Sequence, residues 1–388
     1  MKVLLLTPSM SVRMGGSITS VTVLAKLLAR DHEVEVWTTD HEAKHWDPIL
    51  RDICKVRAFR LMFHRFFVAP GMLQALLREM NGFDAVNVFH FWTMTGLLGG
   101  LLAQFQQGPV FIHTQGILLP VALGHHKWRK RLIQFLGGRW LMNRFPAAVA
   151  CNSVELQSVR QWGFRNAMFV LPNSVIPIAA VRGLMRKQLG LSEDIRIVAY
   201  LNRFDPIKRV VDLCQAFRIV QNSRDDTVFL LAGDAATPHG LEVQAYAKGV
   251  GLRARFLGHL GPQEKWNLLA DADVLCQYSA QEGHSNALTE ALAAGVPVIA
   301  SRGCNFEEIG KEGAGFIVDS VEEMANATTQ LLEDDELRRR MSANALQLAK
   351  SYTPDATAAK YLRIFNECRS AMAPVGGPAA TVHTVSRS

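Results

Sequence analysis

One stretch of the chain, residues 277–301, constrains the fold more than any other. It reads QYSAQEGHSNALTEALAAGVPVIAS, and strand-like apolar runs at 273–278 and 296–300 flank its middle part. Between these runs, Ser285 and Asn286 are residue types that cap helices, alanines and leucines fill the body of a helix, and Gly295 is a typical helix stop. A helix between two apolar strands is a βαβ unit, so the stretch predicts a parallel α/β sheet.

The loop at residues 280–284 leads directly into the amino terminus of this helix. Such a terminus presents unpaired backbone N–H groups and a positive dipole end, which favours anions. Glu282 and Glu290 flank it, and the helical rise places Glu290 little more than one turn into the helix. Both carboxylates can therefore border one pocket that suits phosphates and sugar hydroxyls. The alternative is that they are an ordinary loop charge and an exposed helix residue.

The pair Glu282-x7-Glu290, followed by ALAAGVPVIAS, resembles the most specific motif of the retaining glycosyltransferases of family 4. In that family the first glutamate lies near the donor hexose and the second binds the nucleotide ribose. Backbone amides between them hold the sugar and the diphosphate. The resemblance implies these roles for the two glutamates and a donor-binding backbone at Ser285, Asn286, Ala287 and Leu288.

The chain length of 388 residues exceeds the size at which single hydrophobic cores usually stop growing, so two domains are expected. The resemblance covers residues 1 to about 370 and implies the GT-B fold, in which two Rossmann-like, doubly wound parallel-sheet domains face a central cleft. The predicted parts are a first domain at 1–173, a linker at 174–194, a second domain at 195–353, a helix at 354–372 that crosses back, and a disordered tail at 373–388.

Arg203 and Lys208 follow a predicted strand at 195–201, in the segment NRFDPIKR. Two fixed cations at a strand end can neutralise a diphosphate leaving group without proton transfer. Their spacing resembles the family pattern Gly-Arg-x4-Lys-Gly, although Asn202 and Arg209 replace both glycines. A solvated basic loop is the alternative. No metal-ligand cluster is visible, so we expect no cofactor and a metal-independent reaction.

The first domain offers weaker signals. Gly15 and Gly16 lie in a turn from a strand to a helix, where glycines let a ligand approach the backbone. A glycine pair borders the donor diphosphate and the acceptor in the family. His113 ends a predicted strand in FIHTQG, and family members often have a histidine there, near the donor sugar. A purely structural histidine at a strand end is the alternative.

Positive charge is concentrated in the first half of the chain. Residues 1–172 contain 19 Lys/Arg against 10 Asp/Glu, and the remainder contains 23 against 25. Within an acid-free stretch, residues 125–144 alternate cations with large apolar residues at helical spacing. A basic helix of this kind can lie on an anionic membrane. The residues singled out for this membrane or acceptor side are Lys127, Trp128, Arg129, Lys130 and Arg131.

Two alternatives to membrane contact exist. The helix can instead pack on its own sheet, with its Lys and Arg merely solvated, and a glycine pair at 137–138 interrupts the amphipathic pattern. Nucleic-acid binding is disfavoured because no known module or aromatic platform accompanies the charge. Scattered cysteines, the short N-terminal apolar run and the interrupted apolar segment at 85–126 predict a cytoplasmic protein, at the inner membrane face if the helix binds lipid.

Together these features predict a retaining hexosyltransferase. The donor is a UDP- or GDP-sugar, and the predicted acceptor is a lipid-linked glycan used to build a surface polysaccharide, such as lipopolysaccharide, capsule or exopolysaccharide. Two other functions fit the same motifs. One is a sugar-nucleotide epimerase of the same fold, which acts on the donor alone. The other is a non-catalytic protein that binds sugar nucleotides or glycans.

Overall fold

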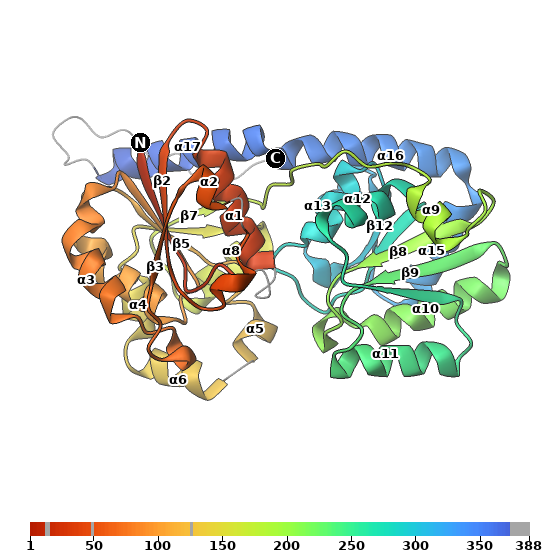
Figure 1. The fold of residues 1–388 in the computed structure, drawn as a ribbon, viewed down its shortest axis with the longest axis horizontal. Coiled ribbons are helices and arrows are strands. Elements are labelled where there is room, and N and C mark those ends of the chain that lie inside the picture. The colour runs from red at the N-terminus through yellow and green to blue at the C-terminus, as the bar shows by residue number, and fades with distance from the viewer. Residues whose placement is uncertain (12–15, 48–49, 125–126, 373–388) are drawn as a thin grey trace.

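The structure is a computed structural model that describes residues 1–11, 16–47, 50–124 and 127–372. The described chain forms two parallel β-sheets that lie side by side, each with helices on both faces (Figure 1). The first sheet has the strand order β3-β2-β1-β4-β5-β6-β7 and the second has β10-β9-β8-β11-β12-β13. The expected fold class, two doubly wound α/β domains, is confirmed.

The strands of the first sheet are β1 (Lys2–Leu6), β2 (Glu33–Thr39), β3 (Lys55–Phe59), β4 (Ala85–Phe89), β5 (Val110–His113), β6 (Ala147–Ala150) and β7 (Ala167–Val170). Those of the second are β8 (Arg196–Leu201), β9 (Thr227–Ala232), β10 (Ala254–Gly258), β11 (Val274–Gln277), β12 (Val298–Ser301) and β13 (Gly315–Val318). All pairs within each sheet are parallel, as in Val3 beside Val34 and Val298 beside Gly315.

Strand composition explains why both faces of each sheet are covered. In β1, Leu4 and Leu6 belong to one buried cluster, whereas Val3 and Leu5 belong to another. Because successive side chains of a strand point to opposite faces, a strand that is apolar throughout requires a helical layer on each side. β8 repeats this arrangement in the second domain, where Ile197 and Val198 lie in different clusters.

The helices of the first domain are α1 (Gly16–Leu28), α2 (Leu50–Ile53), α3 (Pro70–Glu79), α4 (Met94–Leu102), α5 (Pro120–Gly124), α6 (Lys127–Phe135), α7 (Gly138–Met142) and α8 (Ser153–Trp162). The remaining helices are α9 (Leu184–Leu189), α10 (Val210–Ser223), α11 (Pro238–Gly249), α12 (Pro262–Asp271), α13 (Asn286–Ala293), α14 (Glu308–Lys311), α15 (Val321–Glu333), α16 (Asp335–Ala349) and α17 (Pro354–Met372).

The last helix ties the two ends of the described chain together. α16 lies over the second domain and α17 continues across the first, along one edge of the molecule (Figure 1). Tyr361 of α17 is buried in the first domain's core, and its hydroxyl accepts a 2.7 Å hydrogen bond from the side chain of Asn87 in β4. α17 is therefore structurally part of the first domain.

The basic segment forms two short helices rather than one. α6 ends at Phe135, and Gly137 adopts φ 95° before α7 begins. That conformation is accessible to glycine at little cost, so the glycine pair sets the break. No described helix has both the length and the apolar character that a bilayer span requires.

Candidate functional site

The site lies where the carboxyl ends of the parallel strands meet between the two domains. Ligands of such sheets gather at this edge because the connecting loops and helix amino termini face it. β11 and α13 supply its most ordered part. Ser285, the N-cap of α13, accepts from the backbone N–H of Leu288 at 3.4 Å and donates to Oε1 of Gln277, at the end of β11, at 2.7 Å. The predicted cap therefore anchors the strand end to the helix start.

Glu282 is held by three donors on one oxygen. Its Oε1 accepts hydrogen bonds from Gln277 and Ser279, both at 2.7 Å, and forms an ion pair with Lys208. The ammonium of Lys208 is almost fully buried, so the pair is shielded from water. No described residue donates to Oε2 of Glu282. This second oxygen is therefore available to accept from a ligand hydroxyl.

Arg203 and Lys208 occupy different settings in the same loop. Arg203 is exposed, and its guanidinium forms no hydrogen bond or ion pair with the described residues. Lys208 ends a 3-10 turn, η6 (Pro206–Lys208), that packs on the Glu282 loop through a 2.7 Å bond from the N–H of Ala280 to the carbonyl of Ile207. The loop therefore presents one buried, paired cation and one exposed cation that is available to an anion.

Arg209, which stands where the family pattern has a glycine, takes a backbone conformation that glycine favours. Its φ is 50°, in the left-handed region that usually costs a non-glycine residue about 1 kcal/mol or more. Its side chain offsets this cost through a 2.6 Å bond to Asp212 and by stacking 4.6 Å above the ring of Tyr278. The left-handed conformation is therefore adopted here although no glycine stands at this position.

Glu290 has a setting that matches that of Glu282. It lies on the second turn of α13, is nearly buried, and uses Oε1 for an ion pair with Lys265 of α12. Burial raises the pKa of the Glu290 carboxyl, and the Lys265 ammonium opposes this shift. No described residue donates to its Oε2. Both predicted glutamates thus present one lysine-paired oxygen and one available oxygen.

Ala287 and Leu288 contribute backbone rather than side chains. Both side chains are buried under the first turn of α13. Asn286, the first residue of this helix, reaches the other domain, because its Oδ1 accepts a 2.9 Å bond from the side chain of Asn173. Gly16 lies on the same side, where a Cβ would come within 3.4 Å of Asn286 Nδ2. Gly15 lies outside the described residues.

The loop at 281–286 touches the first domain at several further points. The side chain of Asn152 donates to the carbonyl of Gly283, and the N–H of Val121 donates to Gln281 Oε1 at 2.7 Å. Gly116 and Gly283 are so close that a Cβ on Gly283 would lie 3.0 Å from the Cα of Gly116. The two domains therefore meet at the loop that carries Glu282.

His113 ends β5 and is buried behind this contact. Its Nε2 lies 2.8 Å from Asn87 Oδ1, and its ring stacks on Phe89 at 4.5 Å. Asn87 uses its amide N–H to donate to Tyr361, so the network assigns the proton of His113 to Nε2 and leaves Nδ1 as an acceptor. Burial lowers the pKa of His113 to about 3. The imidazole is therefore neutral at pH 7 and suited to accepting a hydrogen bond rather than a proton.

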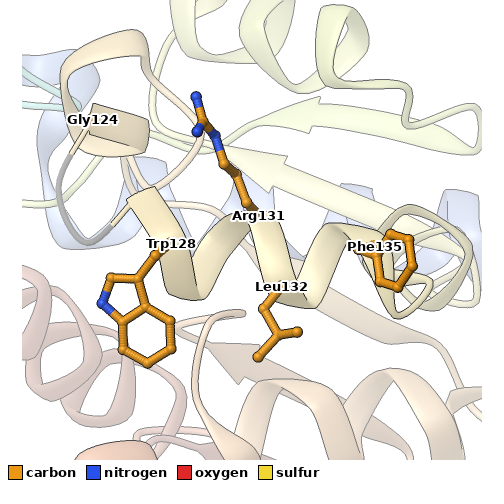
Figure 2. Close-up of a pocket in the computed structure, with 5 residues that line it drawn as sticks. All are labelled: Gly124, Trp128, Arg131, Leu132 and Phe135. Carbon is orange, nitrogen blue, oxygen red and sulfur yellow. The ribbon is translucent and has the colours of Figure 1, made fainter.

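The α6 segment shows which of its predicted residues face outward. Trp128 is exposed, as are Leu132, Phe135 and Arg131, so the alternative of an apolar face packed on the sheet is wrong for this helix. Trp128 and Leu132 point to one side of α6 and Arg131 to the other (Figure 2). With Gly124, these four residues line a surface hollow of 840 Å³. The side chains of Lys127 and Arg129 lie outside the described part.

Lys130 departs from the expectation that it faces a lipid surface. Its ammonium donates to the carbonyl of Ala122 and lies 5.7 Å from the ring centroid of Trp92. Burial lowers the pKa of Lys130. The cation therefore ties α6 to the preceding helix, because an inward position offers it a carbonyl oxygen and an aromatic face.

Several residues of the site are not evident from the sequence. Lys265 and Asn87 belong to no recognisable motif, because each contacts a residue far away in the chain: Lys265 pairs with Glu290, and Asn87 bonds to His113. Gln277 and Ser279 lie within the stretch that organises the fold, yet nothing in their spacing predicts that both bond to Glu282. Among the described residues, no three His, Cys, Asp or Glu side chains gather in a way that could hold a metal ion.

Two family models match most of the chain. "Glycosyltransferase Family 4" matches residues 14–177, and "Glycosyl transferases group 1" matches residues 181–348. The boundary between the matches falls between the two sheets. The chain belongs to glycosyltransferase family 4.

Curated relatives are similar in sequence to part of the chain. The D-inositol 3-phosphate glycosyltransferase of Corynebacterium glutamicum is 32% identical over 47% of this chain and 46% of the relative. The N-acetyl-alpha-D-glucosaminyl L-malate synthase of Bacillus anthracis is 33% identical over 42% of each chain. The matches thus span less than half the length of these two relatives.

A solved structure shows the same architecture over nearly the whole chain. The structure of HepE from Anabaena, in complex with UDP and glucose, superposes with a TM-score of 0.76. It covers 95% of this chain and 100% of that one, at 20% sequence identity. At this identity the likeness establishes the shared fold, GT-B.

Proposed function

We propose that the protein is a retaining glycosyltransferase that moves a hexose from a UDP- or GDP-sugar to an acceptor hydroxyl. One observation carries the proposal. Glu282, in the loop before α13, and Glu290, on the second turn of α13, each pair with a lysine through Oε1 and keep Oε2 available. An anion site between two such acceptors fits a diphosphate with a sugar on one side and a ribose on the other.

Each residue then has a physical task. Arg203 and the amino terminus of α13 stabilise the negative charge that grows on the leaving diphosphate as the glycosidic bond breaks. Lys208 fixes Glu282, whose Oε2 accepts from a hexose hydroxyl, and Lys265 fixes Glu290 for the ribose. His113 accepts a hydrogen bond through Nδ1. Transfer with retention uses one face of the sugar, with the departing diphosphate taking the acceptor's proton and no metal ion required.

We propose a lipid-linked glycan of a surface polysaccharide as the acceptor, and peripheral contact of α6 with an anionic membrane as the means of reaching it. Two features support this choice: Trp128, Leu132 and Phe135 are exposed, and the segment around them contains Lys and Arg but no Asp or Glu. The two curated relatives are named for small acidic acceptors, an inositol phosphate and malate. A soluble anionic acceptor is therefore the choice that remains if α6 does not bind lipid.

The transferase proposal is tested by changing Arg203 to alanine. Because its guanidinium is free to bind the diphosphate, Arg203→Ala should lower turnover by about 10²–10³-fold at saturating donor. Stability should change little, since the side chain is exposed. Arg340→Ala, which removes an exposed cation from α16, is the matched control and should keep full turnover. Equal activity of Arg203→Ala and the wild type would remove Arg203 from the mechanism.

Incubation with donor alone separates the rival functions. A transferase should hydrolyse a UDP- or GDP-sugar slowly, an epimerase should produce the epimer, and a binding protein should leave the donor intact. A thermal-shift panel of UDP, GDP and ADP identifies the base, because a ligand at about 100 times its dissociation constant stabilises by about 2.7 kcal/mol. Absence of any shift and any donor turnover would contradict the proposed function.

A further inference from the structure

The loop between β3 and α3, residues 60–68, exposes large apolar side chains that belong to none of the motifs described above. Met62 and Phe63 are 59% and 63% exposed. Their neighbours include the exposed cations Arg60 and Arg65. We propose that this loop is a second membrane anchor, which acts with α6 on an anionic bilayer. The inference rests on the proposed membrane contact and extends it to a separate part of the chain.

The loop is an ordered element. The N–H groups of Met62 and Phe63 both donate to the carbonyl of Val68, at 2.9 and 3.4 Å, and the N–H of Val68 returns a 3.1 Å bond to Phe63. A side-chain oxygen of Asp40 accepts from the N–H of Leu61 at 2.8 Å. Because the backbone is already fixed, holding the two apolar side chains outward costs little further entropy on binding.

The loop and α6 form one surface. The guanidinium of Arg65 lies 5.2 Å from the ring centroid of Trp128, which joins two segments that are far apart in the sequence. Beyond Trp128, α6 continues the surface with Leu132 and with Phe135, which is 87% exposed. Figure 2 shows Trp128 and Leu132 projecting from the same side of the helix. Large apolar side chains that are exposed side by side mark an interaction surface.

Charge identifies the partner as an anionic bilayer. Residues 53–78 and 85–154 contain no Asp or Glu, while Arg60 and Arg65 are exposed in the loop and the Arg65 guanidinium lies against Trp128. Apolar side chains flanked by cations, with no acid in either segment, match an interface that offers both acyl chains and negative headgroups.

A row of contacts connects the surface to the strand edge at which the candidate site lies. The ring of His64 in the loop lies 5.8 Å from that of His41, and His41 Nδ1 lies 3.2 Å from the hydroxyl of Ser9. Ser9 follows the carboxyl end of β1, the edge at which the site lies. A bilayer bound at the loop would thus lie beside this edge. The surface therefore favours an amphiphilic acceptor whose reactive hydroxyl stays close to the headgroup level.

The test is vesicle sedimentation with the full-length chain. The double change Met62→Ser and Phe63→Ser should weaken binding to vesicles of equal phosphatidylglycerol and phosphatidylcholine by about tenfold or more, because partly buried apolar side chains are lost from the interface. Changing Leu132 and Phe135 of α6 to serine should have a similar effect. The matched control changes Leu241 and Ile219, which are 59% and 42% exposed on helices of the second domain, to serine, and it should bind as the wild type does.

The outcomes separate the loop from the proposed function. If the α6 variant loses binding and the loop variant does not, the second anchor is overturned and the membrane contact of α6 stands. If the control loses binding equally, the effect is general surface hydrophobicity and the inference fails. If the wild type ignores these vesicles at low salt, both membrane contacts are overturned, while donor hydrolysis in the same sample still tests the transferase.

A second measurement does not depend on the serine variants folding. Phe63→Trp places a fluorescent ring at the proposed contact and conserves an exposed aromatic residue. Brominated phosphatidylglycerol should quench the added fluorescence, measured as the difference from the wild type, if the loop enters the bilayer. An unquenched added signal from vesicle-bound protein would overturn the inference.

Discussion

Lysine pairing leaves each glutamate of the site with one oxygen committed and one available. Lys208 and Lys265 stand on different elements, yet each takes Oε1 and leaves Oε2 without a donor among the described residues. The ion pair fixes the carboxylate's position before a ligand arrives, which lowers the entropic cost of binding. In the proposed reaction, Glu282 faces the hexose and Glu290 faces the ribose.

This division predicts different effects of two conservative changes. Glu290→Gln should weaken free nucleotide and sugar nucleotide alike, because the ribose is common to both ligands. Glu282→Gln should leave free nucleotide affinity within about twofold and reduce sugar binding or transfer by tenfold or more, an effect on the order of 1.4 kcal/mol. Titration calorimetry with UDP or GDP and with the matching sugar nucleotide measures both. Equal loss of free nucleotide binding in the two variants would refute the assignment.

His113 is distinguished by a buried, neutral ring. Burial moves its pKa from 6.5 in the unfolded chain to about 3 in the folded protein. Between these values the unfolded state holds more protons, so the free energy of unfolding falls as the pH drops below 6.5. The contribution lost from this group between pH 7 and pH 5 is about 2 kcal/mol.

Replacing the ring should reduce this acid sensitivity. In His113→Asn, the fall in unfolding free energy from pH 7 to pH 5 should be smaller than in the wild type by about 2 kcal/mol, whatever the variant's stability at pH 7. Urea unfolding at the two pH values gives both differences. His90 and His284, whose pKa values burial lowers to about 4, keep part of the acid sensitivity in either protein. Identical pH dependence in wild type and variant would show that His113 is not buried in solution.

At the scale of elements, local patterns predicted most of what the structure contains. Ser285 as a cap, Gly295 as a stop and the apolar runs beside them fix the unit β11-α13-β12, because caps and periodicity act within a few residues. Pairings such as Glu290 with Lys265, or His113 with Asn87, were not predictable in this way. They depend on which helices and strands become neighbours, and no single-sequence pattern carries that information.

The α6 segment also contains a contact that the sequence did not predict. Its composition predicted a basic, amphipathic element, and the exposed Trp128 and Phe135 agree with that prediction. The inward course of Lys130 toward Ala122 was not predictable, because it depends on where α5 packs. A cation's position on a helical wheel does not show whether a carbonyl oxygen lies within its reach.

This difference refines the membrane prediction for α6. Neutralising Lys127, Arg129 and Arg131 with glutamine should weaken binding to anionic vesicles by on the order of 10²-fold, at roughly 1 kcal/mol per cation near the surface. Added salt should mimic the change by screening, and free nucleotide affinity should stay constant. Lys130→Gln alone is the control and should alter vesicle binding little. A Lys130 effect as large as that of the other three together would contradict its inward position.

For the molecule as a whole, the contact of the two domains at Gly283 decides whether the site is complete. Most residues proposed to bind the nucleotide lie in the second domain, whereas Gly16, which is predicted to border the donor diphosphate, comes from the first, as do His113 and Asn152. Asn152 donates to the carbonyl of Gly283, and a Cβ on Gly283 would come within 3.0 Å of the Gly116 backbone, which is a tight contact. A close approach of two backbones is a reason for glycine on both sides.

Widening this contact should separate binding from turnover. In Gly283→Ala the new Cβ would lie 3.0 Å from the Cα of Gly116 and 3.1 Å from its nitrogen, so the domains must move apart by a few tenths of an ångström. Free UDP or GDP should bind within about twofold of the wild type, because its main proposed contacts, Glu290 and the start of α13, lie in the second domain. Turnover should fall by about tenfold to a hundredfold, since such small displacements disturb the alignment of reacting groups. Gly283→Val should lower it further.

Calorimetry with free nucleotide and steady-state rates with the full donor measure the two effects in one preparation. Gly249→Ala is the matched control, because a Cβ at Gly249 meets nothing within 4 Å, and it should leave both quantities unchanged. The result that would refute the idea is a Gly283→Val enzyme with wild-type turnover. The first domain would then contribute no group to the reacting centre, and the contact of Gly116 with Gly283 would be only a point where two surfaces touch.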